Sequence, residues 1–570
     1  MAPHQTTQGG FGPGTYVDTA FTPVPKECRR LLHYFASITS QFTKDDALLD
    51  SVDFVGGDLP IIPGPLKAQA MSAVLHAMCG IVGKEISAMK GIDTGKITIN
   101  TDQAGMYPAS ASLVSINSQK PNDMALDPAI LAAATNLEHG ALMKNPMHLR
   151  AWSIYPTKDA KVWYQIMSNL DAPGFLKAYG MDSEAPVKTN DEAYELMKAE
   201  FSQYSAGELE TKNIEHGFCG QTCYTPQQWR ETLMGKRLAG HPIFNVSRAR
   251  ATPDLPPVPF PCTPNDKRPL AGIKVVELAR VIAAPALGAV LSSFGAEVVK
   301  VESPDLPDPN ALQMTLTAGK YTCPLDLNRE EDRLRLHKLI EGADVVVQAF
   351  RRRSLERKGF GLEDILQMAN KRGKGVVYLD LTCYGPDGTY SERPGFQQIA
   401  DAASGCSYVC GKAYGFEEGV SALPSLPVAD MLTGAAGALD VMLALRERAQ
   451  HGGSYHCDAA LTAIDTIQLK PEFGLYSPEI VKKIQDVHRF APMTPDLHVS
   501  DLLFVVIRAW AETTDVLKRK DFFSHFVESP FGKDHIILAP LVRYENAEVS
   551  PCWKHSPVPY CQHPEVQWAS

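Results

Sequence analysis

The sequence predicts an α/β fold that combines a doubly wound parallel sheet with a smaller α+β domain. Beyond residue 269, β-branched runs alternate with helical segments, which is the pattern of a parallel sheet with helical crossovers. Six prolines within residues 251–264 cannot form a helix or a central strand, so they predict a linker before this sheet. At 570 residues the chain is long enough for two to four domains.

Residues 270–302 carry the clearest β-α-β unit of the chain. A buried strand is predicted over Ile273–Leu278 and a second over Ala296–Val301, with a helix of small residues between them. The loop after the first strand, Ala279–Pro285, lacks the G-x-G-x-x-G pattern of dinucleotide-binding loops. Because such a loop lies at the carboxyl end of the strands, we expect ligand binding there by a different phosphate contact.

Composition excludes several classes of function. A net charge of -10 argues against a nucleic-acid-binding surface. The uncharged run Val281–Ala296 is short for a membrane span and contains Pro285 and Gly288, so no membrane partner is expected. The 12 cysteines are scattered and no secretory signal is visible at residues 1–20, which favours reduced thiols and a cytoplasmic location.

The chain divides into five predicted regions. We expect a flexible tail over 1–26, a mainly helical region over 27–250, the linker over 251–268, the sheet domain over 269–465, and a divergent C-terminal segment over 466–570. Lys67–Met89 is predicted to form an amphipathic helix. The further strands of the sheet are predicted at Glu297–Val301, Asp344–Val347 and Gly375–Leu379.

A weak internal repeat crosses the linker. Leu59–Pro63 precedes a helix and the strand segment Gly95–Asp102, and Leu423–Pro427 precedes a helix and the segment Gly453–Asp458. The same order and similar lengths favour a duplication, although a proline, helix, glycine, strand order also arises by chance.

Seven segments in a fixed order over residues 270–460 resemble the class III CoA-transferase (CaiB/BaiF) family, which includes the α-methylacyl-CoA racemases. These segments are Gly272–Leu278, Gly295–Glu302, Leu325–Leu327, Ala343–Val347, Tyr384–Gly388, Ser391–Phe396 and Pro427–Asp430. Trp152–Met181 and Gln227–Pro242 are similar to later portions of the same family. The resemblance implies a Rossmann-like large domain and a fusion of a partial first copy (27–250) with a near-complete second copy.

The resemblance implies that Asp430 is the nucleophile, which attacks an acyl-CoA thioester to give a mixed anhydride and a free CoA thiolate. The alternative is that Asp430 only caps the helix that follows it, because aspartate is common at that position. The first copy has Lys67 or Ala68 at the matching point, so we expect that copy to be catalytically silent.

The same resemblance implies residues that bind coenzyme A. Lys320 and Arg357 are expected to contact phosphates. Phe350 and Tyr384 are expected to offer flat faces to the adenine or the pantetheine. The set is completed by two residues of the first loop, Val281 and Ala283. Taken singly, Lys320, Arg357, Phe350 and Tyr384 are more simply a surface lysine, a surface arginine and two core aromatics.

Departures from the family keep alternatives open. No glycine-rich loop that covers the transferase site is evident, so the scaffold fits either CoA transfer between an acyl-CoA and a carboxylic acid, an isomerase or cyclase acting on a non-CoA substrate, or a catalytically silent binding subunit. Gln397–Asp401 lacks the histidine of the racemases, which disfavours racemisation. Cysteine and histidine spacings near 216–223 and 552–563 are too irregular to predict zinc, so we expect no metal. The family forms intertwined dimers, so we expect a homodimer.

Overall fold

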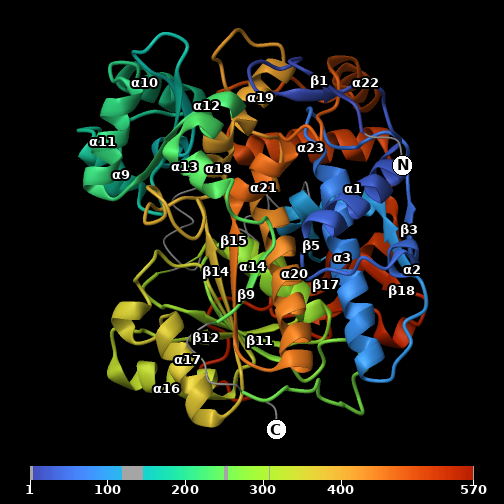
Figure 1. Ribbon diagram of the computed structural model, residues 1–570. Helices are drawn as coiled ribbons and strands as arrows, with labels where there is room; N and C mark the ends of the chain where they lie inside the picture. Colours follow the sequence, from blue (N-terminus) through green and yellow to red (C-terminus); the bar gives the residue numbers. More distant parts are fainter. Residues whose placement is uncertain (1–3, 118–144, 250–254, 307, 569–570) are drawn as a thin grey trace.

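The computed structural model describes residues 4–249, except 118–144, and residues 255–568, except 307. Its centre is a seven-stranded sheet (Figure 1). Six strands are parallel, and only β9, at one edge, is antiparallel. In spatial order the strands are β12 (Lys320–Pro324), β11 (Glu297–Glu302), β10 (Lys274–Leu278), β13 (Val345–Gln348), β14 (Val377–Thr382), β15 (Tyr455–Ala460) and β9 (Asn245–Arg248).

The strand order has a switch point between β10 and β13. From β10 the chain first adds β11 and β12 on one side, then returns to add β13, β14 and β15 on the other. The loops that leave β10 and β13 therefore diverge and open a crevice at the carboxyl ends of these strands. This order confirms the predicted doubly wound sheet.

Helices cover both faces of the sheet. On one face α14 (Ala283–Ser293) and α20 (Val428–His451) pack over Val275 and Val345. On the other face α16 (Glu330–Gly342) and α17 (Leu362–Arg372) pack over Val276 and Val346. Among the described helices, α20 alone is long and apolar enough to cross a membrane, but its apolar stretch of 18 residues is buried inside the protein, as in a core helix.

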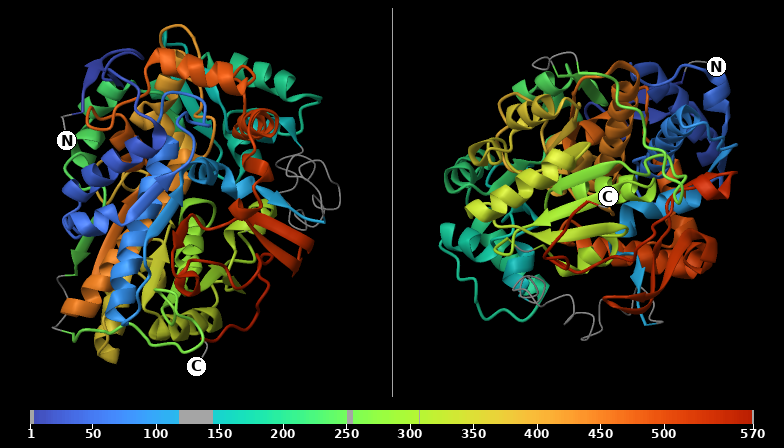
Figure 2. Two further views of the ribbon diagram at one scale, coloured as in Figure 1. Left: turned by 90° about the vertical axis from the view of Figure 1, so that its right-hand side faces the viewer. Right: turned by 90° about the horizontal axis from the view of Figure 1, so that it is seen from below.

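The first half of the chain supplies a second, small sheet. β3 (Val52–Val55) and β4 (Ile97–Asn100) are parallel, and β18 (Val542–Tyr544), from the far end of the chain, pairs antiparallel with β4. Between them α3 (Ala68–Met89) runs beside α20 (Figures 1 and 2). Most of α3 is buried, including polar positions along its length, so the predicted amphipathic helix is instead a core helix.

A smaller α+β unit lies at the upper left of Figure 1. Its antiparallel sheet orders β6 (Ile154–Pro156), β7 (Trp163–Met167) and β8 (Cys219–Thr222). Its helices are α8 (Pro146–Arg150), α9 (Ala172–Ala178), α10 (Asn190–Phe201) and α11 (Ala206–His216). This unit confirms the predicted smaller domain and packs around its own aromatic core.

The N-terminal residues differ from the predicted flexible tail. β1 (Thr6–Gln8) and β2 (Tyr16–Asp18) form a hairpin, and α1 (Val24–Ile38) begins within the predicted tail. Lys67 holds this segment against the core, because its buried Nζ lies 2.6 Å from Asp18 Oδ2 and 2.7 Å from Glu27 Oε1. The ion pairs explain why the segment is held against the core despite its glycine-rich sequence.

A further small sheet and the remaining α-helices complete the described fold. The C-terminal strands β16 (Phe523–Ser529) and β17 (Gly532–Leu538) form a sheet with β5 (Val114–Ser115). The other helices are α2 (Asp46–Asp50), α4 (Thr101–Met106), α12 (Pro226–Glu231), α13 (Leu233–Leu238), α15 (Asn310–Leu316), α18 (Gln397–Ser404), α19 (Cys406–Ala413), α21 (Leu461–Gln468), α22 (Pro478–His488) and α23 (Val499–Thr513). Residues 255–268 of the predicted linker contain no helix or strand.

Candidate active site

A cavity of about 220 Å³ opens at the carboxyl edge of the sheet, at the switch point. The loops after β10, β13 and β14 form its floor, and the first turn of α20 forms one wall. Asn169 and Leu170, which follow β7 of the small unit, form the facing wall. Four predicted site residues meet here: Val281, Ala283, Phe350 and Asp430.

Asp430 is the carboxylate that faces this cavity. It is the third residue of α20, and its side chain does not cap the helix, because the N-cap residue is Pro427 and no side-chain capping bond forms there. The residue is 7% exposed, and no hydrogen bond or ion pair to its carboxylate is found among the described residues. Burial raises the pKa of Asp430 to about 7. This carboxyl has a high proton affinity, lines the cavity and accepts no hydrogen bond from the described residues, so its oxygens are available to attack a substrate.

Arginines surround the same cavity. Arg280, Arg351, Arg352 and Arg393 line it, and two of them are already oriented by acids. Arg280 Nε lies 3.2 Å from Asp308 Oδ1, and Arg393 Nη1 lies 2.7 Å from Glu210 Oε1. Arg351 donates to the carbonyl of Gly217 over 3.1 Å. The cavity is therefore suited to an anionic ligand.

The sequence alone gave weak signals for these arginines. Arg351 and Arg352 lie three and four residues after the end of β13, so their position near a strand end at the switch point was the signal that the sequence offered. The run of three arginines is equally typical of a solvated face. Arg393 lies inside the segment Ser391–Phe396 that carried the family resemblance, and that segment forms a wall of the cavity.

Lys320 lies outside the cavity, although the family resemblance implied that it contacts a phosphate. It begins β12, and its fully buried Nζ lies 2.7 Å from Glu277 Oε2 and donates to the Pro285 carbonyl over 2.6 Å. Burial lowers the pKa of the Lys320 ammonium. Since the ammonium is neutralised inside the core beneath α14, the expected phosphate contact is wrong for this structure.

Tyr384 and Arg357 also lie outside the cavity lining. Tyr384 is buried, donates its hydroxyl to Gln221 Oε1 over 2.8 Å and packs against Tyr390. It joins the large sheet to the small unit instead of offering a free face to a base. Arg357 is exposed on a short 3₁₀ turn, Glu356–Lys358, seven residues beyond Phe350.

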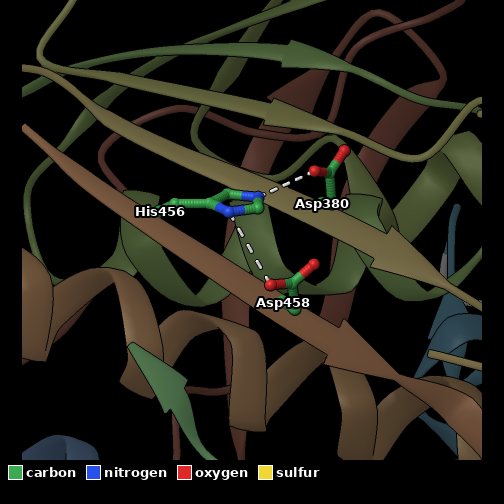
Figure 3. Close-up of side chains that lie close together, drawn as sticks. All are labelled: Asp380, His456 and Asp458. Atoms are coloured by element: carbon green, nitrogen blue, oxygen red, sulfur yellow. Dashed lines mark hydrogen bonds and ion pairs between the residues drawn. The ribbon is translucent and has the colours of Figure 1, made fainter. Parts of the chain in front are cut away.

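A second polar cluster lies on adjacent strands of the sheet. Figure 3 shows the His456 imidazole facing the carboxylates of Asp380 and Asp458. Nε2 lies 2.8 Å from Asp380 Oδ2 and Nδ1 lies 3.8 Å from Asp458 Oδ2. Burial alone would lower the pKa of His456, but the hydrogen bond that its ring donates to Asp380 and the charges of both carboxylates outweigh burial and raise the pKa. Because both ring nitrogens face carboxylates, the contacts are those of an imidazolium that joins β14 to β15.

This cluster is also the one group of three or more potential metal-ligating side chains within the described parts of the chain. The cysteines and histidines singled out from their spacing do not form such a group there. Cys219, for example, donates its thiol to Asn169 Oδ1 over 2.7 Å. Its sulfur therefore helps to position the facing wall of the cavity.

Comparison with known proteins gives one family and several relatives. The model of CoA-transferase family III matches residues 270–510. An acyl-CoA transferase of Gibberella moniliformis is 46% identical over 565 residues, 98% of each chain. An acetyl-coenzyme A transferase of Hypoxylon pulicicidum is 29% identical over 87% of this chain and 84% of its own length. The beta subunit of a succinyl-CoA–L-malate CoA-transferase of Chloroflexus aurantiacus is 37% identical over 39% of this chain and 55% of its own length.

Proposed function

Because the chain belongs to CoA-transferase family III, we propose that it moves CoA between an acyl-CoA and a carboxylic acid with Asp430 as the nucleophile. The observation that carries this proposal is the position of Asp430. Its carboxylate faces a cavity lined by arginines, at the point of the sheet where α/β proteins bind their ligands.

The proposed reaction proceeds through covalent intermediates on Asp430. The carboxylate attacks the thioester carbonyl, which forms a mixed anhydride and releases the CoA thiolate. The thiolate then attacks the Asp430 carbonyl of the anhydride, so the first acid leaves and an aspartyl-CoA thioester remains. The incoming carboxylate repeats these two exchanges in reverse and leaves as its own CoA thioester, which restores Asp430.

The arginines supply the anion contacts in this proposal. Arg351 and Arg352 lie on the cavity at the end of β13, and we propose that they contact CoA phosphates in place of Lys320. Val281, Ala283 and Phe350 then contact the remainder of the nucleotide and pantetheine. Arg393 forms an ion pair with Glu210 and lines the same cavity as Asp430. It is therefore placed to orient the carboxylate substrate.

Asp430→Asn tests the nucleophile. We expect transfer between acyl-CoA and acid to fall at least about 1,000-fold, because the amide cannot form the anhydride. Mass mapping after incubation with a labelled acyl-CoA should find an acyl or CoA adduct on the Asp430 peptide of the wild type alone. The wild-type rate should increase with pH up to about 7, as the carboxyl loses its proton.

Asp440→Asn is the matched control. Asp440 lies on the same helix and is fully buried, but it is outside the cavity. Burial raises its pKa well above the usual value, so an amide replaces a neutral group. Transfer that persists in Asp430→Asn, or an adduct on another residue, would contradict the proposal. CoA that fails to raise the melting temperature would favour a non-CoA substrate.

We further propose a homodimer in solution, on the family's intertwined dimers. Light scattering coupled to gel filtration measures the mass directly. A mass of one chain would contradict a dimer and would indicate that the two halves of one chain replace the two subunits.

A further inference from the structure

Two buried carboxyls lie behind Asp430. Asp401 on α18 and Asp465 on α21 are 0% and 1% exposed, and their carboxyls lie close enough to share a hydrogen bond. Two carboxylates can do this only if at least one of them holds a proton. The Oδ1 atom of each is buried and receives no other hydrogen bond from the described groups, so a retained proton supplies the missing donor.

The polar partners of this pair are neutral. The Gln397 amide donates to Asp401 Oδ2 over 3.0 Å, and the Ser404 hydroxyl lies 3.5 Å from Asp465 Oδ2. No lysine, arginine or histidine forms an ion pair with either carboxyl within the described ranges. Without a cation, a charge on this pair has no compensation, and burial favours the protonated form.

The pair is joined to the loop that positions Asp430. The Gln397 amide also donates to the Leu426 carbonyl over 3.3 Å, four residues before Asp430. A negative charge on Asp430 acts on both Asp401 and Asp465 and disfavours their ionisation. The three carboxyls thus form one electrostatic cluster, of which only Asp430 lines the cavity.

The other titratable groups facing Asp401 and Asp465 are thiols, whereas Asp430 also shares its cavity with the four arginines described above. The thiols are Cys223 after β8, Cys383 after β14, and Cys406 and Cys410 on α19. Burial raises the pKa of each of these thiols, so they carry no charge near neutral pH. The charge of the cluster is therefore decided among the three carboxyls.

We propose that Asp401 and Asp465 are a positioning pair that keeps its protons, so that the single negative charge of the cluster resides on Asp430, facing the substrate. This inference rests on the proposed function of Asp430. The order of ionisation agrees with it: the pKa of Asp430 is about 7, that of Asp465 is about 8, and that of Asp401 is raised well above its usual value, all mainly by burial. At higher pH a second charge enters the cluster and repels the carboxylate substrate.

The pH profile of transfer tests the pair. For the wild type we expect the rate to rise about tenfold per pH unit below 7 and to fall by a similar factor per unit above about 8. Asp465→Asn should keep the acidic limb and lose the alkaline one, because the group that ionises near pH 8 becomes an amide. Asp401→Asn should keep the acidic limb and shift the alkaline one, because Asp465 then lacks its carboxyl partner. Asp440→Asn, which changes a buried carboxyl elsewhere on α20, should keep both limbs.

A purely structural role would lower activity at every pH and leave the shape of the profile unchanged. An alkaline limb that survives in Asp465→Asn overturns the inference, as does a wild type without that limb. If the variants do not fold, isotope-edited infrared spectroscopy of wild type labelled on aspartate carboxyls replaces them. Protonated carboxyls that titrate near pH 8 support the pair, and their absence overturns it.

The two proposals fail in different ways. An Asp430 adduct together with a profile that lacks the alkaline limb contradicts the pair alone. The absence of any Asp430 adduct contradicts the transferase proposal, whereas the infrared titration still reports whether Asp401 and Asp465 hold their protons.

Discussion

Several buried charges among the described residues form ion pairs that hold the fold together. Lys67 lies between Asp18 and Glu27, Lys300 Nζ lies 3.0 Å from Asp308 Oδ2, and Arg448 Nη2 lies 3.0 Å from Asp344 Oδ1. Such pairs offset the cost of removing each ion from water. Asp430 has no such partner within the described residues and instead faces a cavity, which separates its role from that of the structural ions.

Lys320→Met tests the structural assignment of that residue. Removing the ammonium leaves the Glu277 carboxylate buried without its partner, so the free energy of unfolding in urea should fall by about 3–5 kcal/mol. The double variant Lys320→Met/Glu277→Leu should recover most of this loss. If Lys320→Met has normal stability but has lost its affinity for CoA, that result would support the phosphate contact that the family resemblance implied.

At the scale of elements, the crossing of α14 and α20 positions the cavity. Gly434 of α20 is in close contact with α14: a Cβ at this position would lie 2.7 Å from the Ala283 carbonyl oxygen and 2.8 Å from the Ala286 Cβ. Gly437 approaches Leu287 in the same way. Since Ala283 lines the cavity and Gly434 lies one turn after Asp430, this contact sets the spacing between the first loop and the nucleophile.

We expect Gly434→Ala to push the start of α14 away from α20. Overpacking of this kind costs about 1–3 kcal/mol of stability, and the shift of Ala283 should raise the KM for acyl-CoA. Gly207→Ala is the control, because Gly207 lies on α11 with no atom near the added methyl group, so the change should leave KM unaltered. An unchanged KM in Gly434→Ala would show that the crossing does not govern the site.

At the scale of the molecule, the two halves of the chain interlock. β9 of the first half extends the large sheet by pairing with β15, and β18 of the second half extends the small sheet by pairing with β4. The Lys67 ammonium also donates to the Phe473 carbonyl over 3.0 Å. The predicted linker therefore joins two segments that share sheets and a core, rather than two independent domains.

Splitting the chain within the linker tests this. Residues 1–249 and 255–570 expressed separately should be insoluble or unfolded, because each loses a strand partner and the α3–α20 core. Co-expressed with a tag on one half alone, they should purify together and regain transfer activity. Circular dichroism and gel filtration of each half provide the measurement, and a folded, soluble half would contradict the shared core.

Sequence patterns captured the parts of this structure that local residues specify. The strands β10, β11 and β13 were predicted within one residue at each end, because each is a β-branched run. The prediction for β14 begins two residues and ends three residues too early. β12 was missed, because Lys320–Pro324 contains one apolar aromatic and no such run. Asp430 and three other residues that the family resemblance implied, Val281, Ala283 and Phe350, line one cavity, and their roles there stay predictions. Lys320 and Tyr384 lie outside this cavity, because buried partners from other strands decide where their side chains point.

The contact between Asp401 and Asp465 leaves no trace in local sequence. The two residues lie on different helices and meet only after α18 and α21 pack together. Periodicity marks both as buried positions, but it does not show which buried polar groups become neighbours. Sites that depend on such distant contacts are found from the structure.

The pairing of β4 with β18 has a consequence for synthesis. Ile97–Asn100 leaves the ribosome more than 400 residues before Val542–Tyr544, its antiparallel partner. Long-range strand pairing of this kind folds slowly, since the intervening chain must first be ordered. Until then the nascent chain exposes the part of α3 around Gly80, which contacts Val542 and Tyr544 of β18 in the folded protein. Chaperone depletion should therefore trap the chain before its last strand arrives.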